Sequence, residues 1–232
     1  MLSYLFVVAH PDDEILGAGG TIIKLVELGH KVSICFMSGN VEARVGRPSL
    51  NRLTSNIEKM KSYLGIDTVI KGNFQNISFN TSSHLELVQF VEKAILDTKA
   101  NIVFTHHPSD LNNDHYHTSI ACQAASKLSQ RRKDVTEIKE LLFMEVLSAT
   151  DWGLNTSLKQ FTPNVFIEIK EKRLLKKIKA LDIYDGVMRD YPHPRSKESI
   201  RGLAAYRGSQ SGSIYAEAFE SVYRKDDDTL TK

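Results

Sequence analysis

Short apolar runs alternate with longer amphipathic segments along the first half of the chain. Four short runs are rich in β-branched and aromatic side chains, which favours buried strands; they are residues 4–9, 32–37, 68–71 and 102–105. Four longer segments follow them in turn with apolar side chains at helical spacing; they are residues 14–28, 50–64, 85–96 and 114–128. One face of the third segment is expected to be apolar and comprises Leu85, Val88, Val91 and Ile95. This alternation predicts a parallel sheet covered by helices on both faces.

The alternation becomes less regular after residue 129. Two further strands and a strongly basic helix are expected, at residues 141–147, 165–169 and 171–184. A helix from about residue 196 follows two prolines, and residues 213–223 alternate partly between apolar and polar. No internal repeat or linker is visible, so we expect one α/β domain over residues 1–223. Residues 224–232 are charged and poor in apolar side chains, and we expect them to be frayed.

The composition is that of an ordinary globular protein, with 41% hydrophobic and 25% charged residues. The 30 basic and 28 acidic side chains leave a net charge of +2, which indicates neither a nucleic-acid nor a membrane partner. Cys35 and Cys122 stand in different segments, which excludes a disulfide framework and suits a reducing compartment. The apolar run at residues 4–9 is too short to span a membrane and lacks a basic region before it. We therefore expect a soluble, cytoplasmic protein.

The first cluster of side chains that could bind a metal or transfer a proton directly follows the first predicted strand. The sequence there reads His-Pro-Asp-Asp-Glu, over residues 10–14. Sites in open parallel sheets form beyond the carboxyl ends of the strands. A turn at Pro11 lets His10 and Asp13 converge on one point. One carboxylate can then bind a cation while Asp12 takes a proton. For either aspartate alone, capping of the next helix is an equally good explanation.

The second cluster of such side chains follows the fourth predicted strand. It holds four of the eight histidines, within residues 106–117. Neighbours on a strand point to opposite faces, so at most one of His106 and His107 faces the site. On a helix that begins near Asp114, the side chains of His115 and His117 lie about 200° apart and cannot share one metal. His115 is the better ligand, with Asp114 as its partner or as the helix cap. His117 is expected to be a partly exposed helical residue.

One histidine and one carboxylate from the first cluster, with one histidine from the second, form a His-Asp-His set. Neutral imidazoles and a carboxylate suit zinc, and three protein ligands leave a position for water, as in catalytic sites. The same set suits non-haem iron(II), so spacing alone does not determine the metal.

Two other motifs are better explained by packing and solvation than by ligand binding. The glycine-rich segment at residues 17–20 does not match G-x-G-x-x-G and follows three acids, so we expect close helix–sheet packing rather than a dinucleotide loop. The basic run at residues 170–179 has no interleaved aromatic side chains, so we expect a solvated helix face rather than a nucleic-acid patch.

These motifs together resemble the PIG-L/LmbE-like zinc-dependent N-deacetylases. The likeness rests on Ala-His-Pro-Asp-Asp-Glu at residues 9–14 and on His-Pro-Ser-Asp with Asn-Asn-Asp-His at residues 107–110 and 112–115. A less specific C-terminal likeness lies in Tyr-Arg-Gly and Tyr-Ala-Glu-Ala-Phe, at residues 206–208 and 215–219. The resemblance implies a Rossmann-like three-layer sandwich, with a mostly parallel sheet. It also implies hydrolysis of an N-acetyl group on an amino sugar or its conjugate, and makes self-association an expectation.

Carried over by position, the resemblance makes His10, Asp13 and His115 the zinc ligands and Asp12 the general base. Many members carry a histidine three positions before the last ligand, where this chain has Asn112. An asparagine amide can donate a hydrogen bond to an oxyanion but cannot supply a proton. Either Asp12 returns the proton to the leaving amine, or another histidine such as His107 or His193 is the acid. We expect Asp12 to do so, with Asn112 or a neighbour as oxyanion donor.

Further contacts are expected around this centre. Asp110 and Asp114 are expected to support the histidine ligands. Candidate substrate-binding side chains are Asn40, Arg44, Arg47, Trp152, His193 and Arg195. An arginine fork could hold a phosphate or sugar hydroxyls, and a tryptophan could stack on a sugar ring. Solvent-facing loop arginines and a rim or core tryptophan are the competing interpretations. Arg207 and Glu217 are expected to pair beneath the rim.

Two other functions fit parts of the pattern. A non-haem iron(II) oxygenase fits the ligand set but not the neighbouring base. A non-catalytic sugar-binding module could keep the fold and the metal, although the presence of Asp12 beside all three ligands argues against it. The expected partner in the first interpretation is a small N-acetylated amino sugar or conjugate.

Overall fold

The computed structural model describes residues 2–40, 48–154 and 159–225. A seven-stranded sheet with the order β3-β2-β1-β4-β5-β7-β6 lies at its centre. The strands are β1 (Ser3–Val8), β2 (Lys31–Phe36), β3 (Thr68–Lys71), β4 (Ile102–His106), β5 (Glu140–Met144), β6 (Val165–Glu168) and β7 (Ala216–Arg224). β1 to β5 run parallel, and β7 is antiparallel to both of its neighbours. The predicted α/β fold with a mostly parallel sheet is confirmed.

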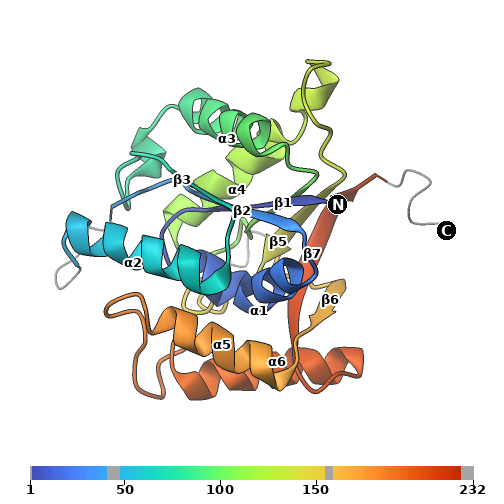
Figure 1. Ribbon diagram of the computed structural model, residues 1–232. Coiled ribbons are helices and arrows are strands. Elements are labelled where there is room, and N and C mark those ends of the chain that lie inside the picture. Colours follow the sequence, from blue (N-terminus) through green and yellow to red (C-terminus); the bar gives the residue numbers. More distant parts are fainter. Residues whose placement is uncertain (1, 41–47, 155–158, 226–232) are drawn as a thin grey trace.

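Helices cover both faces of the sheet (Figure 1). They are α1 (Asp13–Glu27), α2 (Leu50–Leu64), α3 (His84–Thr98), α4 (Asn113–Ala125), α5 (Glu171–Leu181) and α6 (Lys197–Ser211). α3 and α4 lie on one face, and α1 and α2 lie on the other, where α5 packs outside α1. Within the described ranges, no helix is long and apolar enough to cross a membrane.

The central strands are buried on both faces, which explains their continuous apolar runs. Along β1, Phe6 and Val8 belong to the core under α1 and α2. Leu5 and Val7 belong to the opposite core, which is shared with α3 and α4. Alternate side chains of one strand thus anchor both helical layers.

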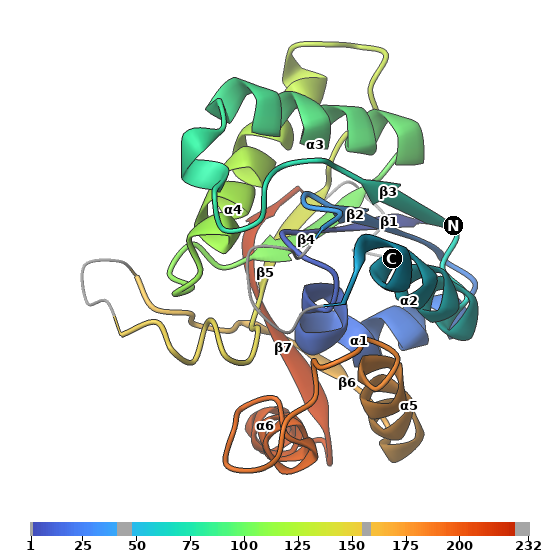
Figure 2. The ribbon, with the colours of Figure 1, turned by 90° about the vertical axis from the view of Figure 1, so that its left-hand side faces the viewer.

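The strand order reverses between β1 and β4, which are neighbours in space although two strands and three helices separate them in sequence. Ligand sites of doubly wound sheets form at the carboxyl ends of strands that flank such a reversal. The two segments rich in histidine and aspartate follow β1 and β4, so the topology brings them together at this point (Figure 2).

Most element boundaries lie within a few residues of those expected from the pattern. β5 ends at Met144, earlier than predicted, because a turn over residues 146–150 follows it. β7 extends to Arg224, which pairs in register with Glu140, so the first residue of the segment expected to be frayed lies in a strand. Leu85, which was expected on the apolar face of its helix, is 62% exposed. Leu87 is buried in the core in its place.

A buried ion pair lies against the kink of α1. Ala18 has non-helical backbone angles, and the two halves of the helix meet there at a kink. The carboxylate of Glu217 accepts hydrogen bonds from the amides of Gly20 and Thr21, at 2.9 and 2.6 Å. Lys177 Nζ lies 2.7 Å from the same carboxylate and donates to the carbonyl of Leu16 at 2.9 Å. The pair thus satisfies backbone groups at the kink.

These contacts correct two predictions. Glu217 pairs with Lys177 rather than with Arg207, whose guanidinium instead contacts the carboxylate of Glu145 at 2.6 and 2.9 Å. The basic run at residues 170–179 is not wholly a solvated face, because Lys177 points inward and is buried. Sequence spacing could not reveal this, since the partner carboxylate comes from a strand near the other end of the chain.

Close packing against the sheet and the segment after β6 explains the glycines on either side of the kink, as predicted. A Cβ on Gly17 would lie 3.1 Å from Met144 Cβ, and one on Gly20 would lie 2.7 Å from Ile169 Cγ2. These distances leave no room for a larger side chain without movement of the neighbours.

We expect Glu217→Ala to lower the free energy of unfolding by about 3–5 kcal/mol, because it leaves a buried ammonium and two backbone amides unpaired. Urea unfolding followed by circular dichroism measures the change.

Glu171→Ala is the matched control, because it removes a carboxylate that pairs with Arg201 at the surface and should leave the unfolding midpoint nearly unchanged. Equal midpoints for the two variants would contradict the role assigned to Glu217.

Candidate active site

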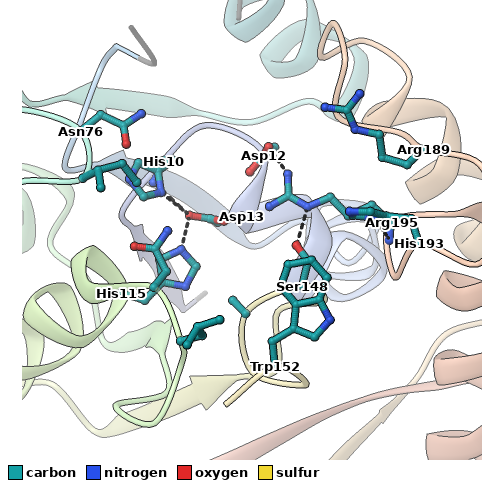
Figure 3. A pocket seen from close by; sticks show the side chains of 14 residues that line it. His10, Asp12, Asp13, Asn76, His115, Ser148, Trp152, Arg189, His193 and Arg195 are labelled. Carbon is teal, nitrogen blue, oxygen red and sulfur yellow. Dashed lines mark hydrogen bonds and ion pairs between the residues drawn. The ribbon is translucent and has the colours of Figure 1, made fainter. Parts of the chain in front are cut away.

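A cavity of about 300 Å³ opens at the carboxyl ends of β1 and β4 (Figure 3). His10, Asp12 and Asp13 reach it from the turn after β1, and Asn112 and His115 reach it from the start of α4. The opposite wall comes from the segment after β5 and from the loop between α5 and α6. The segment after β3 adds Asn76 and Ile77, so the cavity lies where five distant parts of the chain meet.

Three buried side chains point at one another within this cavity. Asp13 Oδ2 lies 3.4 Å from His10 Nδ1 and 3.2 Å from His115 Nε2. One ligand atom of each residue lies within 4.8 Å of the other two. The turn is locally fixed, because the His10 amide donates to Asp13 Oδ2 at 3.0 Å. This spacing suits a single divalent ion.

Two further carboxylates hold the imidazoles from behind. His10 Nε2 lies 2.9 Å from Asp114 Oδ2, and His115 Nδ1 lies 2.8 Å from Asp110 Oδ2. An ionised carboxylate only accepts hydrogen bonds, so these two ring nitrogens carry the protons. In the neutral rings, the lone pairs of the other two nitrogens then face Asp13. Carboxylates that fix histidine tautomers in this way are typical of metal sites, and the donor set fits a divalent ion.

The charges of this cluster also favour a cation. Burial alone would lower the pKa of His115, but the charges of Asp13 and Asp110 outweigh it and raise the pKa to about 10. Burial would likewise raise the pKa of Asp13, yet the neighbouring imidazoles hold it well below its usual value. Three carboxylates packed around the imidazoles of His10 and His115 thus favour positive charge at this point.

Asp114 also fixes a third loop. Its two carboxylate oxygens accept hydrogen bonds from the amides of Ile77 and Phe79, at 2.6 and 3.0 Å. Ile77 adopts a left-handed conformation, with φ of 62°. One buried carboxylate therefore ties the segment after β3 to His10 in the first turn.

His106 is part of the site although its position was left open by the alternation. Its ring stacks on that of His115, with centroids 3.7 Å apart and planes inclined by 23°. His106 Nε2 accepts a hydrogen bond from the Ala9 amide at 2.8 Å, and burial together with the charge of His115 lowers its pKa. His106 therefore supports a ligand side chain from the last position of β4.

Asp12 faces a different part of the cavity from Asp13. Its Oδ2 lies 3.0 Å from Arg195 Nη1, and Arg195 Nε donates to Ser148 Oγ at 2.7 Å. Figure 3 shows this guanidinium between Asp12 and Ser148, on the far side of Asp13 from His115. Asp12 and Ser148 both have positive φ angles, of 116° and 67°. Such strained conformations persist where the surrounding contacts hold them.

Glu14, the third acid of the first motif, stabilises the turn after β1. Glu14 Oε2 accepts the amide hydrogen of Asp12 at 3.0 Å, and Tyr184 donates its hydroxyl to Glu14 Oε1 at 2.8 Å. Burial raises the pKa of Glu14 to about 8, so the group is mostly neutral at pH 7. Glu14 thus supports the backbone of Asp12 without adding a further negative charge.

Residues 5–126 of the chain match the profile of the PIG-L family, described as GlcNAc-PI de-N-acetylase. This match covers more than half of the chain and includes both histidine-containing motifs. The chain belongs to the PIG-L family. The resemblance seen in its motifs is therefore confirmed.

Solved structures of other proteins share this fold. The conserved protein TT1542 from Thermus thermophilus superimposes with a TM-score of 0.79 at 22% identity, over 100% of both chains. N,N'-diacetylchitobiose deacetylase from Pyrococcus horikoshii gives 0.76 at 20% identity, over 95% of this chain and 84% of that one. GalB from Pseudomonas putida, a 4-carboxy-2-hydroxymuconate hydratase, gives 0.77 at 18% identity, over 98% of each chain. At these identities the likeness shows the fold alone.

Several side chains expected at the site of this PIG-L family chain line the cavity. They are His10, Asp12, Asp13, Asn112, His115, Trp152, His193 and Arg195. Asn112 also caps α4, where its Oδ1 accepts the amide hydrogen of Asp114 at 3.0 Å. Trp152 is 41% exposed and contacts His193 edge to face, with centroids 5.7 Å apart. Sequence reasoning missed Asn76, Ser148 and Arg189, which also line the cavity but belong to no recognisable motif.

His107 does not line the cavity, which corrects the expectation of a catalytic role. Its ring lies on the opposite face of the strand end, edge-on to Phe143 and Phe161. Its Nδ1 contacts Ser109 Oγ at 2.6 Å, and its Nε2 lies 3.5 Å from Glu220. Since adjacent strand residues alternate, the inward position belongs to His106 instead.

The remaining expected substrate contacts take other places. Asn40 does not line the cavity, but its carbonyl accepts a hydrogen bond from Asn76 Nδ2 at 3.3 Å. Arg44 and Arg47 lie outside the described residues. Asp114 proves to be the partner of His10 rather than of His115, whose partner is Asp110.

We expect purified wild-type protein to retain one equivalent of a divalent metal that His115→Ala loses, since that change removes one of three ligands. Asp110→Asn should weaken metal affinity by about 10-fold to 100-fold, because it disturbs the proton on His115 Nδ1. Metal content after dialysis and competition with a chelating dye measure both effects.

His117→Ala is the control, because His117 is on the same helix but does not line the cavity. Its metal content should equal that of the wild type. Undiminished metal binding by His115→Ala would contradict the assigned site.

Proposed function

We propose that this protein is a metal-dependent hydrolase that removes an N-acetyl group from an amino sugar or a related small conjugate. The observation that carries the proposal is the convergence of His10, Asp13 and His115 on one point with Asp12 beside it in the same cavity. Family membership supports it, because the family is described by a de-N-acetylase activity on a GlcNAc conjugate. The deacetylase from Pyrococcus horikoshii supports it through the shared fold.

His10, Asp13 and His115 would hold the metal, for which zinc is the expected ion. When bound, a divalent ion supplies Lewis acidity that polarises an amide carbonyl and makes water more acidic. Asp110 and Asp114 keep the two imidazoles in the tautomers that such an ion requires.

Asp12 is the general base in this proposal. Its carboxylate lines the cavity next to the metal ligands without belonging to them. The contact with Arg195 orients the carboxylate. Removal of a proton from water by Asp12 allows attack on the acetamide carbonyl, and the protonated Asp12 then delivers a proton to the departing amine. His107 does not line the cavity, so His193 on the opposite wall is the remaining alternative to Asp12 as the proton donor.

Asn112 is positioned to stabilise the negative charge that develops on the carbonyl oxygen. Its Oδ1 is used to cap α4, which leaves the Nδ2 hydrogens for the cavity that the residue lines. An amide donor can stabilise an oxyanion without transferring a proton. This division leaves both proton transfers to Asp12.

The cavity wall fits a sugar-sized ligand. A volume of about 300 Å³ is at the lower end of small-molecule sites. Trp152 presents a partly exposed ring at the rim, and Asn76 and Ser148 contribute polar groups. Aromatic faces and hydrogen-bonding side chains are the usual contacts of carbohydrates with proteins.

The hydratase neighbour shows that this fold also occurs in a protein named for the addition of water to a substrate. Deacetylation is distinguished from such a reaction by its product, because only amide hydrolysis releases acetate and a free amine. An iron(II) oxygenase is distinguished by a requirement for oxygen.

We expect the protein to release acetate from N-acetylglucosamine or its glycosides, and a chelator to abolish the release. Asp12→Asn should retain the metal but lower kcat by about 100-fold to 10,000-fold, because general base catalysis contributes about that factor. Coupled acetate detection under air and under nitrogen, with metal analysis of the same samples, measures these effects.

His117→Ala is again the control and should keep full activity. Wild-type turnover by Asp12→Asn would rule out the assigned base, and unimpaired acetate release after complete removal of metal would rule out the metal-dependent reaction.

A further inference from the structure

Arg189 stands out among the arginines of the described residues. Nine arginines lie in these ranges, and seven of them form an ion pair with an aspartate or glutamate. Arg189 lines the cavity but has no acidic partner among the described residues. Arg224, the other unpaired arginine, lies at the end of β7 and does not line the cavity. An unpaired guanidinium at the cavity is therefore specific to Arg189.

The acids of the cavity are already engaged with other partners. Asp13 lies between the two ligand histidines, and Asp12 contacts Arg195. No other aspartate or glutamate of the described chain lines the cavity. The charge of Arg189 is therefore not balanced by the protein at this wall.

We propose that Arg189 binds a negatively charged group, a carboxylate or a phosphate, on the part of the substrate that carries the leaving amine. This inference rests on the proposed N-deacetylase function and adds the chemical class of its substrate. A planar guanidinium with five N–H donors matches either anion with paired, charge-assisted hydrogen bonds.

The position of Arg189 determines which end of the substrate it can meet. Figure 3 shows Arg189, His193 and Arg195 on the opposite side of the cavity from His10 and His115. A substrate with its acetamide at the metal ligands would extend its other end toward these residues. Arg189 thus acts on a part of the substrate that does not react, where binding affects affinity more than chemistry.

The surrounding segment fixes the backbone of Arg189, whose side chain is exposed to solvent at the rim of the cavity. The Arg189 amide donates to the carbonyl of Arg195 at 3.3 Å, which closes the loop between the two arginines. Arg195 uses Nε and Nη1 for Ser148 and Asp12, and its Nη2 has no partner among the described residues. Burial and the charges of Arg195 and Arg189 lower the pKa of His193, against a weaker opposing effect of Asp151. Arg189 is therefore the cation of this wall that no carboxylate of the described residues neutralises.

Three glycosides of N-acetylglucosamine test the inference, since they differ only in the group at the anomeric position. The methyl glycoside is neutral, the carboxymethyl glycoside carries a carboxylate, and the 1-phosphate carries a phosphate. We expect the wild type to prefer an anionic compound in kcat/KM by at least about 10-fold. Arg189→Gln should remove that preference, by about 10-fold to 100-fold and mainly through KM. The anionic compound whose kcat/KM falls more in Arg189→Gln identifies the anion that Arg189 binds.

Arg201→Gln is the matched control, because Arg201 pairs with Glu171 at the surface outside the cavity. It should leave all three values unchanged, and Arg189→Lys should retain part of the preference. Equal turnover of neutral and anionic glycosides by the wild type would overturn the inference, as would equal losses on all three in Arg189→Gln.

Calorimetric binding of the corresponding glucosamine glycosides separates this inference from the proposed function. Tighter binding of the glucosamine compound that carries a carboxylate or phosphate, and loss of that advantage in Arg189→Gln, would support the anion site. This result would hold even if no acetate is released and the deacetylase proposal fails. Acetate release without any charge-dependent binding supports the deacetylase and overturns the anion site.

Discussion

Contacts between buried carboxylates and imidazoles are the interactions on which the rest of this site depends. Asp114 and Asp110 lie behind His10 and His115, yet they determine which ring nitrogen carries a proton and which faces Asp13. Buried carboxylates are costly unless positive charge lies close to them. Without a metal that charge resides on the imidazoles, and a divalent ion can supply it instead. The same contacts thus account for the orientation of the ligands and for the attraction of the site for a cation.

The sheet topology brings these partners within reach of one another. β1 and β4 are neighbours at the reversal of strand order, so the turn after β1 and the start of α4 face each other. Asp114 then binds the amides of Ile77 and Phe79, which adds the segment after β3 to the same assembly. Lys177 and Glu217 hold the bend of α1, the helix whose first residue is Asp13. Polar contacts between residues distant in sequence therefore position both the segment after β3 and the helix that carries Asp13.

The adjacent carboxylates of Asp12 and Asp13 differ because they meet different parts of the chain. Asp13 faces the histidines of the segment matched by the PIG-L family, whereas Asp12 meets Arg195 from the loop before α6. The first half of the chain therefore contributes the candidate metal ligands, and the second half orients the proposed base. That loop also contributes Arg189, so one segment serves both the proposed chemistry and the proposed selection of an anionic substrate.

Much of the architecture could be predicted from the sequence, because strand and helix periodicity are local properties. The order of elements, the close packing at the glycines around the kink and the two clusters of ligand-type side chains all followed from spacing. Side-chain direction at a strand end was harder: alternation allows only one of His106 and His107 to face the site, and the structure shows that His106 stacks on His115.

Ion pairs between distant segments could not be predicted from the sequence. Lys177 was expected on a solvated face, and Arg189 belonged to no motif, because their surroundings come from elements far away in the chain. What the sequence determined by itself was the residue types and their spacing, from which the family and the candidate ligands followed. What only the tertiary structure decided was which charges are matched and which are not, because a side chain is neutralised by its neighbours in space, not by those in sequence.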